Sequence, residues 1–153
     1  MKTLRSFLRV FAIVGIVALA GTLSASAKEK AINKSALPKA AQTTLTKYFS
    51  NEKIARVTQD TNMFGTTEYE VDFTSGRDIE FDNTGAWKSI DCKNVAVPSA
   101  LVPSAIAKYI SSAAPNTRIV KIEKDRGGYD VKLSNGREYK FDHRGNFRYS
   151  EYD

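Results

Sequence analysis

A stretch of twenty residues occurs twice in this chain and limits the fold more than any other feature. Tyr69–Lys88 reads YEVDFTSGRDIEFDNTGAWK, and Tyr129–Arg148 reads YDVKLSNGREYKFDHRGNFR. The two align without an insertion or a deletion, which chance would rarely produce. The chain is therefore expected to contain two copies of one structural unit. The matched positions are Tyr69, Val71, Phe73, Gly76, Arg77, Phe81, Asp82, Gly85 and Trp87 in the first copy, and Tyr129, Val131, Leu133, Gly136, Arg137, Phe141, Asp142, Gly145 and Phe147 in the second.

Apolar and polar residues alternate strictly at the start of this stretch. Tyr69, Val71 and Phe73 are apolar, whereas the residues before and between them are acidic. Such alternation is typical of a strand in an antiparallel sheet with one buried face. Gly76 and Gly85 stand where tight turns between strands need a positive φ. The stretch therefore predicts consecutive antiparallel strands joined by hairpin turns.

A helix is expected before each set of strands. Apolar residues between Pro38 and Phe49 recur at three- and four-residue spacing, which places them on one helical face. A second helix is predicted over about 99–112, with a break at Pro103 because proline removes a helical hydrogen bond. The predicted fold is α+β: two tandem helix-plus-four-stranded antiparallel meander repeats, residues 36–93 and 97–153, with the helices packed on one face of a sheet of up to eight strands. Residues 28–35 are expected to be a short, polar, mobile lead-in.

The N-terminus carries the three parts of a secretory signal peptide. These are the basic residues Lys2, Arg5 and Arg9, an apolar run over 10–23, and the small-residue site at 25–27. The apolar run is too short and too rich in small residues for a comfortable membrane span, although an uncleaved anchor is the alternative. We expect residues 1–27 to be removed and the product to be periplasmic or secreted, with no membrane insertion after cleavage.

Charge and residue counts exclude several classes of function. Removal of residues 1–27 takes away three basic residues and no acid, so 23 Lys and Arg against 17 Asp and Glu become 20 against 17, a net charge of +3. That charge is too small to mark a nucleic-acid-binding surface. The single cysteine, Cys92, cannot form an internal disulfide; we expect a small buried side chain, with an intermolecular disulfide as the alternative. The single histidine, His143, is expected on a hairpin turn, so neither a zinc site nor a His-based catalytic pair is predicted, and no cofactor is expected.

One hairpin of the first copy carries six acids on what is predicted to be a single polar face. Strand alternation by itself produces exposed acids without a function. Clustered acids do repel one another, and a docking face for a basic partner would make use of them. Paired carboxylates for glycoside hydrolysis or calcium binding are further alternatives. The six acids are Glu68, Glu70, Asp72, Asp78, Glu80 and Asp82, and their counterparts are Gly128, Asp130, Lys132, Glu138, Lys140 and Asp142.

The predicted loop over 60–67 is longer than its counterpart over 125–128 and carries Met63 and Phe64. An exposed pair of large apolar side chains would be a binding anchor, since such side chains dominate interface energies. The alternative is that both fold back over the open end of the sheet. Met63, Phe64 and the six acids are the candidate binding residues.

Both copies share the pattern Y-x-V-x-F/L-x-x-G-R-x-x-x-F-D-x-x-G-x-W/F. A signal peptide followed by two helix-plus-meander copies with this pattern resembles the PepSY-like family of exported proteins, which are similar in fold to beta-lactamase inhibitor proteins. The resemblance covers nearly all of the chain after residue 27. It implies the fold, export and a binding or inhibitory role, and it supplies no catalytic residues.

We therefore expect a non-enzymatic exported protein that binds a protein or peptide partner, with inhibition of a protease or another hydrolase as one form of that activity. A structural or envelope-interaction module with no inhibitory activity is the alternative. A hydrolase that uses the acidic hairpin is a third reading. The oligomeric state is left open.

Overall fold

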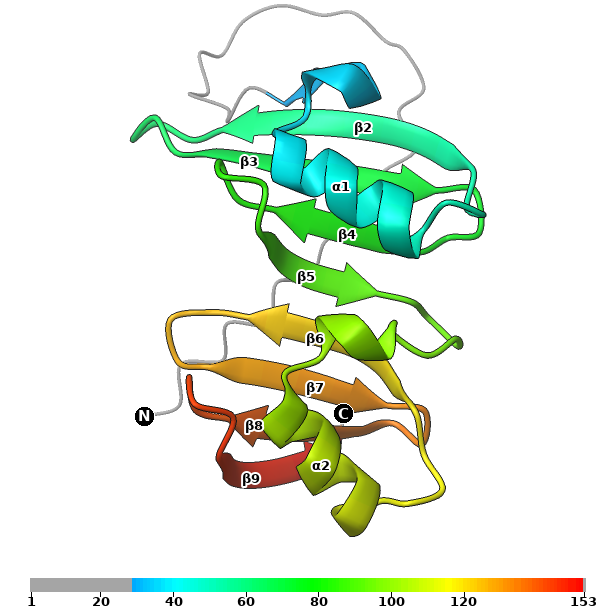
Figure 1. The fold of residues 1–153 in the computed structure, drawn as a ribbon. Helices are drawn as coiled ribbons and strands as arrows, with labels where there is room; N and C mark the ends of the chain where they lie inside the picture. Colours follow the sequence, from blue (N-terminus) through cyan, green and yellow to red (C-terminus); the bar gives the residue numbers. More distant parts are fainter. Residues whose placement is uncertain (1–28, 153) are drawn as a thin grey trace, which may run out of the picture.

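The computed structural model describes residues 29–152, and the expected signal peptide over 1–27 lies outside them. The chain forms one open antiparallel sheet of nine strands, in which each strand pairs with its neighbours in sequence. Two helices lie on the same face of this sheet (Figure 1), α1 over Lys39–Tyr48 and α2 over Ser104–Ala113. The fold is therefore α+β, as predicted. The strands are β1 (Lys30–Ala31), β2 (Ile54–Thr61), β3 (Thr67–Phe73), β4 (Asp78–Phe81), β5 (Trp87–Asp91), β6 (Ile119–Lys124), β7 (Tyr129–Leu133), β8 (Arg137–Phe141) and β9 (Phe147–Tyr152).

Strand β1 corrects two expectations, because the sheet has nine strands and residues 28–35 are not simply a mobile lead-in. Lys30 lies opposite Gln59 and Ala31 opposite Thr58. A 3-10 helix, η1 (Lys34–Ala36), then leads toward α1. Period-two alternation could not reveal β1, because two residues are too few to show a period.

Each helix begins directly after a proline. Pro38 precedes α1 and Pro103 precedes α2, and a short 3-10 helix stands before each proline, η1 and η2 (Ser99–Leu101). Proline is tolerated at a helix start because the N–H groups of the first turn have no helical partner. The break predicted at Pro103 is confirmed, and the two helices have the same length of ten residues.

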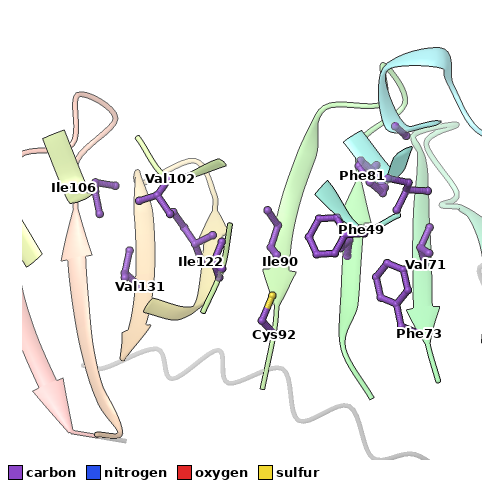
Figure 2. Packing of buried hydrophobic residues seen from close by; sticks show 14 of the residues in the cluster. Phe49, Val71, Phe73, Phe81, Ile90, Cys92, Val102, Ile106, Ile122 and Val131 are labelled. Carbon is purple, nitrogen blue, oxygen red and sulfur yellow. The ribbon is translucent and has the colours of Figure 1, made fainter. Parts of the chain in front are cut away.

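One hydrophobic core lies between the sheet and the helices (Figure 2). The two halves of the molecule join where β5 pairs with β6, with Ile90 opposite Ile122. Both side chains are fully buried, so the core continues across the junction. Burial of such apolar area is the dominant stabilising contribution in a chain of this size. The largest fully buried side chains are Phe81, Phe141, Leu45, Ile79, Ile90, Ile106, Ile122 and Leu133.

The opposite face of the sheet is the polar one. No helix covers it between residues 29 and 152 (Figure 1). In that same range, neither helix is long and apolar enough to cross a membrane. The open face is therefore available as a surface, and the site residues predicted from the sequence lie on it or at its margin.

Candidate binding site

The β2–β3 hairpin ends in a turn that displays two large apolar side chains. Strands β2 and β3 extend to Thr61 and Thr67, so the connecting loop is shorter than the predicted 60–67. Met63 is 77% exposed and Phe64 is 85% exposed. These residues do not fold back over the sheet, and the hairpin projects beyond the neighbouring turns (Figure 1). We call residues 62–66 the apolar tip.

Asn62 holds the backbone of the apolar tip in place. Its side-chain oxygen accepts hydrogen bonds from the backbone N–H groups of Phe64 and Thr66, both at 3.0 Å. Its own N–H donates to the carbonyl of Thr66 at 3.0 Å, and Gly65 N–H donates to the Asn62 carbonyl at 2.9 Å. An asparagine side chain that bonds to its own turn in this way is a recognised turn-forming device. The two apolar side chains therefore stand on a preformed support.

Four of the six predicted acids share one region of the open face. Antiparallel register places Glu70 directly opposite Glu80, and Asp72 directly opposite Asp78. Asp91 of β5 continues the second row, opposite Asp78. Like charges directly opposite each other in a sheet are destabilising. We call Glu70, Asp72, Asp78, Glu80 and Asp91 the acidic strip. The repulsion among these carboxylates has to be offset by nearby cations.

Two cations provide part of that offset. Arg56 Nε lies 3.1 Å from the carboxylate of Asp72, and Lys93 Nζ lies 3.0 Å from those of both Asp78 and Asp91. Burial raises the pKa of Asp78, and the hydrogen bond and charge of Lys93 act in the opposite direction. Lys93 is itself the one non-glycine residue with a positive φ between residues 29 and 152. Sequence inspection missed both cations because neither belongs to the acidic hairpin.

The remaining two acids stand apart from the acidic strip. Glu68 lies near the apolar tip and forms an ion pair with Lys88 of β5. Asp82 lies in the turn after β4, one residue beyond the end of the strand. Its carboxylate accepts hydrogen bonds from the backbone N–H groups of Thr84 at 2.8 Å and Ala86 at 3.1 Å, and from the Thr84 hydroxyl at 2.6 Å. Burial raises the pKa of Asp82, but these hydrogen bonds outweigh it and leave the pKa below its usual value.

The second half of the open face is mixed in charge, as the sequence indicates. Lys140 lies 2.6 Å from Asp130 and 3.3 Å from Glu138. Burial lowers the pKa of this lysine, and its carboxylate partners more than reverse the effect, so the net shift is upward. Asp142 accepts N–H groups of its own turn, as Asp82 does. The acidic strip is thus confined to β3, β4 and β5.

No group of three or more His, Cys, Asp or Glu side chains converges on a possible metal position within residues 29–152. His143 is exposed on the β8–β9 turn. Cys92 is buried in the hydrophobic core, and its burial raises the pKa of the thiol to about 11. A buried, protonated thiol is a poor nucleophile.

A cavity of about 230 Å³ lies beneath α2 and was not predicted from the sequence. Val97, Val102, Ile110 and Ala114 are among its lining residues. The sequence held one signal for it, the alanines at 107 and 114, where the first helix region has Gln42 and Phe49.

The model of a family described as PepSY-like and, provisionally, as beta-lactamase-inhibitor-like matches residues 23–65 and 67–149 of the chain. No curated protein is similar enough in sequence to count as a relative. These two matched segments do not test the repeat boundaries expected at 36–93 and 97–153, which stay a prediction.

Several solved structures are similar. A protein from Bacteroides vulgatus, provisionally described as periplasmic and assigned to the DUF2874 family, is 41% identical, with a TM-score of 0.77 over 80% of this chain and 96% of that one. A second protein from Bacteroides vulgatus, provisionally described as periplasmic and of unknown function, is 38% identical, with a TM-score of 0.76 over 81% and 99% of the two chains. A protein from Bacteroides thetaiotaomicron, provisionally described as calcium-regulated and periplasmic, is 38% identical, with a TM-score of 0.77 over 80% and 96%. These neighbours confirm the expected location, periplasmic or secreted.

Proposed function

The chain belongs to the PepSY-like family of beta-lactamase-inhibitor-like proteins, and from this premise we propose that it is a non-enzymatic binding protein that engages a protein or peptide partner. Export places that partner outside the cytoplasm. The family is not described as one of enzymes, no metal-ligand group converges within residues 29–152, and the cysteine is buried. Recognition is the activity that its surface supports best.

The apolar tip is the observation that carries this proposal. Single exposed apolar side chains are ordinary on protein surfaces. Met63 and Phe64 differ from that background because they are adjacent, are 77% and 85% exposed, and stand on a turn that Asn62 already holds by hydrogen bonds. A preformed turn lowers the ordering cost that association imposes. Large apolar anchors that enter a partner's pocket account for most of the binding energy at many interfaces.

The acidic strip supplies a second, electrostatic contribution. Its rows lie on β3, β4 and β5, and β3 also leads out of the apolar tip. An acidic surface partly on the same hairpin as an apolar anchor favours a partner with Lys or Arg near its apolar pocket, chiefly by raising the association rate. This contribution should weaken at high salt, because the carboxylates of the acidic strip are partly exposed and charges in contact with water are screened over about 8 Å at physiological ionic strength.

Inhibition of a hydrolase is the form of binding to test first, because the family is described as beta-lactamase-inhibitor-like. The second candidate is a structural or envelope-interaction module that binds without inhibiting. An inhibition assay against a panel of beta-lactamases and proteases separates the two. Inhibition that depends on the apolar tip supports the first, and a flat result across the panel leaves the second.

The experiment for binding compares three immobilised proteins exposed to the exported fraction of the source cells. These are the wild type, the double variant Met63→Ser with Phe64→Ser, and the control Arg126→Ala in the equivalent turn of the second half. Arg126 is also exposed, so neither replacement opens the core. We expect one partner band that the wild type and the control retain and the double variant loses, with all three melting at the same temperature. Equal retention by all three proteins, or a lower melting temperature for the double variant, would contradict the anchor role.

A further inference from the structure

The two halves of the molecule can be compared position by position from the residue before each helix to the first strand after it. Residues 37–59 align with 102–124 without a gap, so that residue 49 corresponds to residue 114. Phe49 and Ala114 each follow a ten-residue helix directly. The N–H of Phe49 donates to Leu45 O at 3.0 Å, and that of Ala114 donates to Ile110 O at 2.8 Å. Ala114 thus occupies the backbone position of Phe49 but lacks its ring.

In the first half, the space beside the end of the helix is filled. Phe49 is 5% exposed and stacks on Phe73 with ring centroids 5.5 Å apart (Figure 2). Leu37 is also buried. The side chain of Gln42 donates to the carbonyls of Leu37 at 2.8 Å and Ser35 at 3.2 Å, so these hydrogen bonds hold it against the segment before α1.

In the second half, each of those side chains is smaller. Ala114 replaces Phe49, Val102 replaces Leu37 and Ala107 replaces Gln42, and all three line the cavity of about 230 Å³. Two other matched positions are larger in the second half, Ile106 for Ala41 and Tyr109 for Thr44, but neither side chain lines the cavity, and the Tyr109 ring packs on Phe147 with centroids 4.7 Å apart. The cavity therefore lies beside the position at which the first half carries a phenyl ring, although Leu133, the counterpart of Phe73, does not line it.

The walls of this cavity suit an apolar group. Val97, Val102 and Ile110 are buried, while Ser99 and Pro115 are exposed, so the cavity reaches the surface. None of its lining residues is charged. A dry apolar cavity of about 150 Å³ is already large enough to bind benzene. A ring with its linking methylene therefore fits the volume available here.

We propose that this cavity is a binding site for an aromatic side chain of the partner protein, with Phe49 as the internal model of the bound ring. The inference extends the proposed function, because the ring would belong to the partner. The pocket itself does not depend on the apolar tip, and its test uses a probe that requires no partner.

The test is a titration of the methyl-labelled protein with toluene, which represents a phenylalanine side chain, followed by NMR. We expect saturable shifts of the Val102 and Ile110 methyl signals. Ala114→Phe should weaken binding about tenfold or more, because the new ring occupies the space and burial of one ring is worth more than one decade of affinity. The double variant Val102→Leu with Ala107→Gln introduces the residues that the first half has at positions 37 and 42. It should also weaken toluene binding. Phe49→Ala should create a second set of shifts, at Leu45, in the first half.

The source of the ring is tested with blocked Gly-Phe-Gly and Gly-Ala-Gly tripeptides. Displacement of toluene by the first peptide and not by the second supports a partner side chain. Toluene binding with no displacement by either peptide would overturn that assignment in favour of a free small aromatic molecule. Absence of shifts in the wild type, or shifts that Ala114→Phe leaves unchanged, would overturn the pocket. The Met63→Ser, Phe64→Ser protein should bind toluene as the wild type does, so failure of the apolar tip and failure of the pocket are distinguishable.

Discussion

Gly85 and Gly76 share a left-handed backbone conformation, with φ of +85° at both, but their surroundings differ. A Cβ at residue 76 would meet nothing within 4 Å. A Cβ at residue 85 would lie 2.8 Å from the backbone nitrogen of Ala41 and 2.8 Å from Cβ of Pro38. The turn before β5 therefore packs against the start of α1 with no room for a methyl group. We predict that Gly85→Ala destabilises the protein more than Gly76→Ala does.

The size of the difference follows from separate contributions. Alanine at positive φ costs roughly 1–2 kcal/mol, and the reduced freedom of the unfolded chain returns about 0.4–1 kcal/mol. Gly76→Ala should therefore lower the free energy of unfolding by about 1 kcal/mol. Gly85→Ala has the same contributions. In addition, its new methyl group overlaps the backbone nitrogen of Ala41, and a backbone atom cannot rotate away as a side chain can. Overpacking of this kind costs about 1–3 kcal/mol, so the total is about 2–4 kcal/mol.

Urea denaturation followed by circular dichroism measures the difference. The denaturant dependence for small proteins is about 1–3 kcal/mol per molar urea, so an extra 2 kcal/mol or so moves the midpoint by about 1 M. The second half offers an independent pair: a Cβ at Gly145 would lie 3.0 Å from Cβ of Ala105, whereas one at Gly136 would meet nothing within 4 Å. Midpoints for Gly85→Ala and Gly76→Ala that coincide would refute the close packing of turn and helix.

Three further predictions concern single groups. Asp82→Ala should lower the free energy of unfolding by about 1 kcal/mol at neutral pH. Because the pKa of Asp82 is depressed in the folded protein, the difference from wild type should shrink below about pH 4. A difference that does not depend on pH would contradict the role of Asp82 in the turn. Cys92 should resist a thiol reagent in the native protein at mildly alkaline pH and react fully in urea, because burial raises its pKa to about 11; rapid native reaction or a dimer on non-reducing electrophoresis would count against this. Calcium titrated into the protein should give no binding heat and no change in melting temperature, since no group of metal ligands converges within residues 29–152. A saturable binding heat would instead extend to this chain the calcium regulation described for the Bacteroides thetaiotaomicron protein.

The acidic strip shows how far alternation in the sequence can reach. Glu70 and Asp72 share a face because side chains two positions apart in a strand always do. Their placement opposite Glu80 and Asp78 follows from a short hairpin whose turn sets the register. Asp82 breaks the pattern because β4 ends at Phe81, and beyond that point period-two spacing no longer applies. Its match with Asp142 was the better guide, since both carboxylates accept N–H groups of their own turns.

The sequence by itself determined the hairpins, the helix start at Pro38 and the break at Pro103, because each of these depends on residues a few positions apart. It also determined the repeated unit, because the two stretches can be compared position by position without a gap. Only the tertiary structure decided what distant residues do to one another. It brought Arg56 beside Asp72, placed Gly85 beneath the start of α1, and left Phe64 on the outside of the molecule. The empty space at Ala114 is of the same kind. A cavity is a volume that neighbours from several elements fail to fill, so no local pattern of residues announces it.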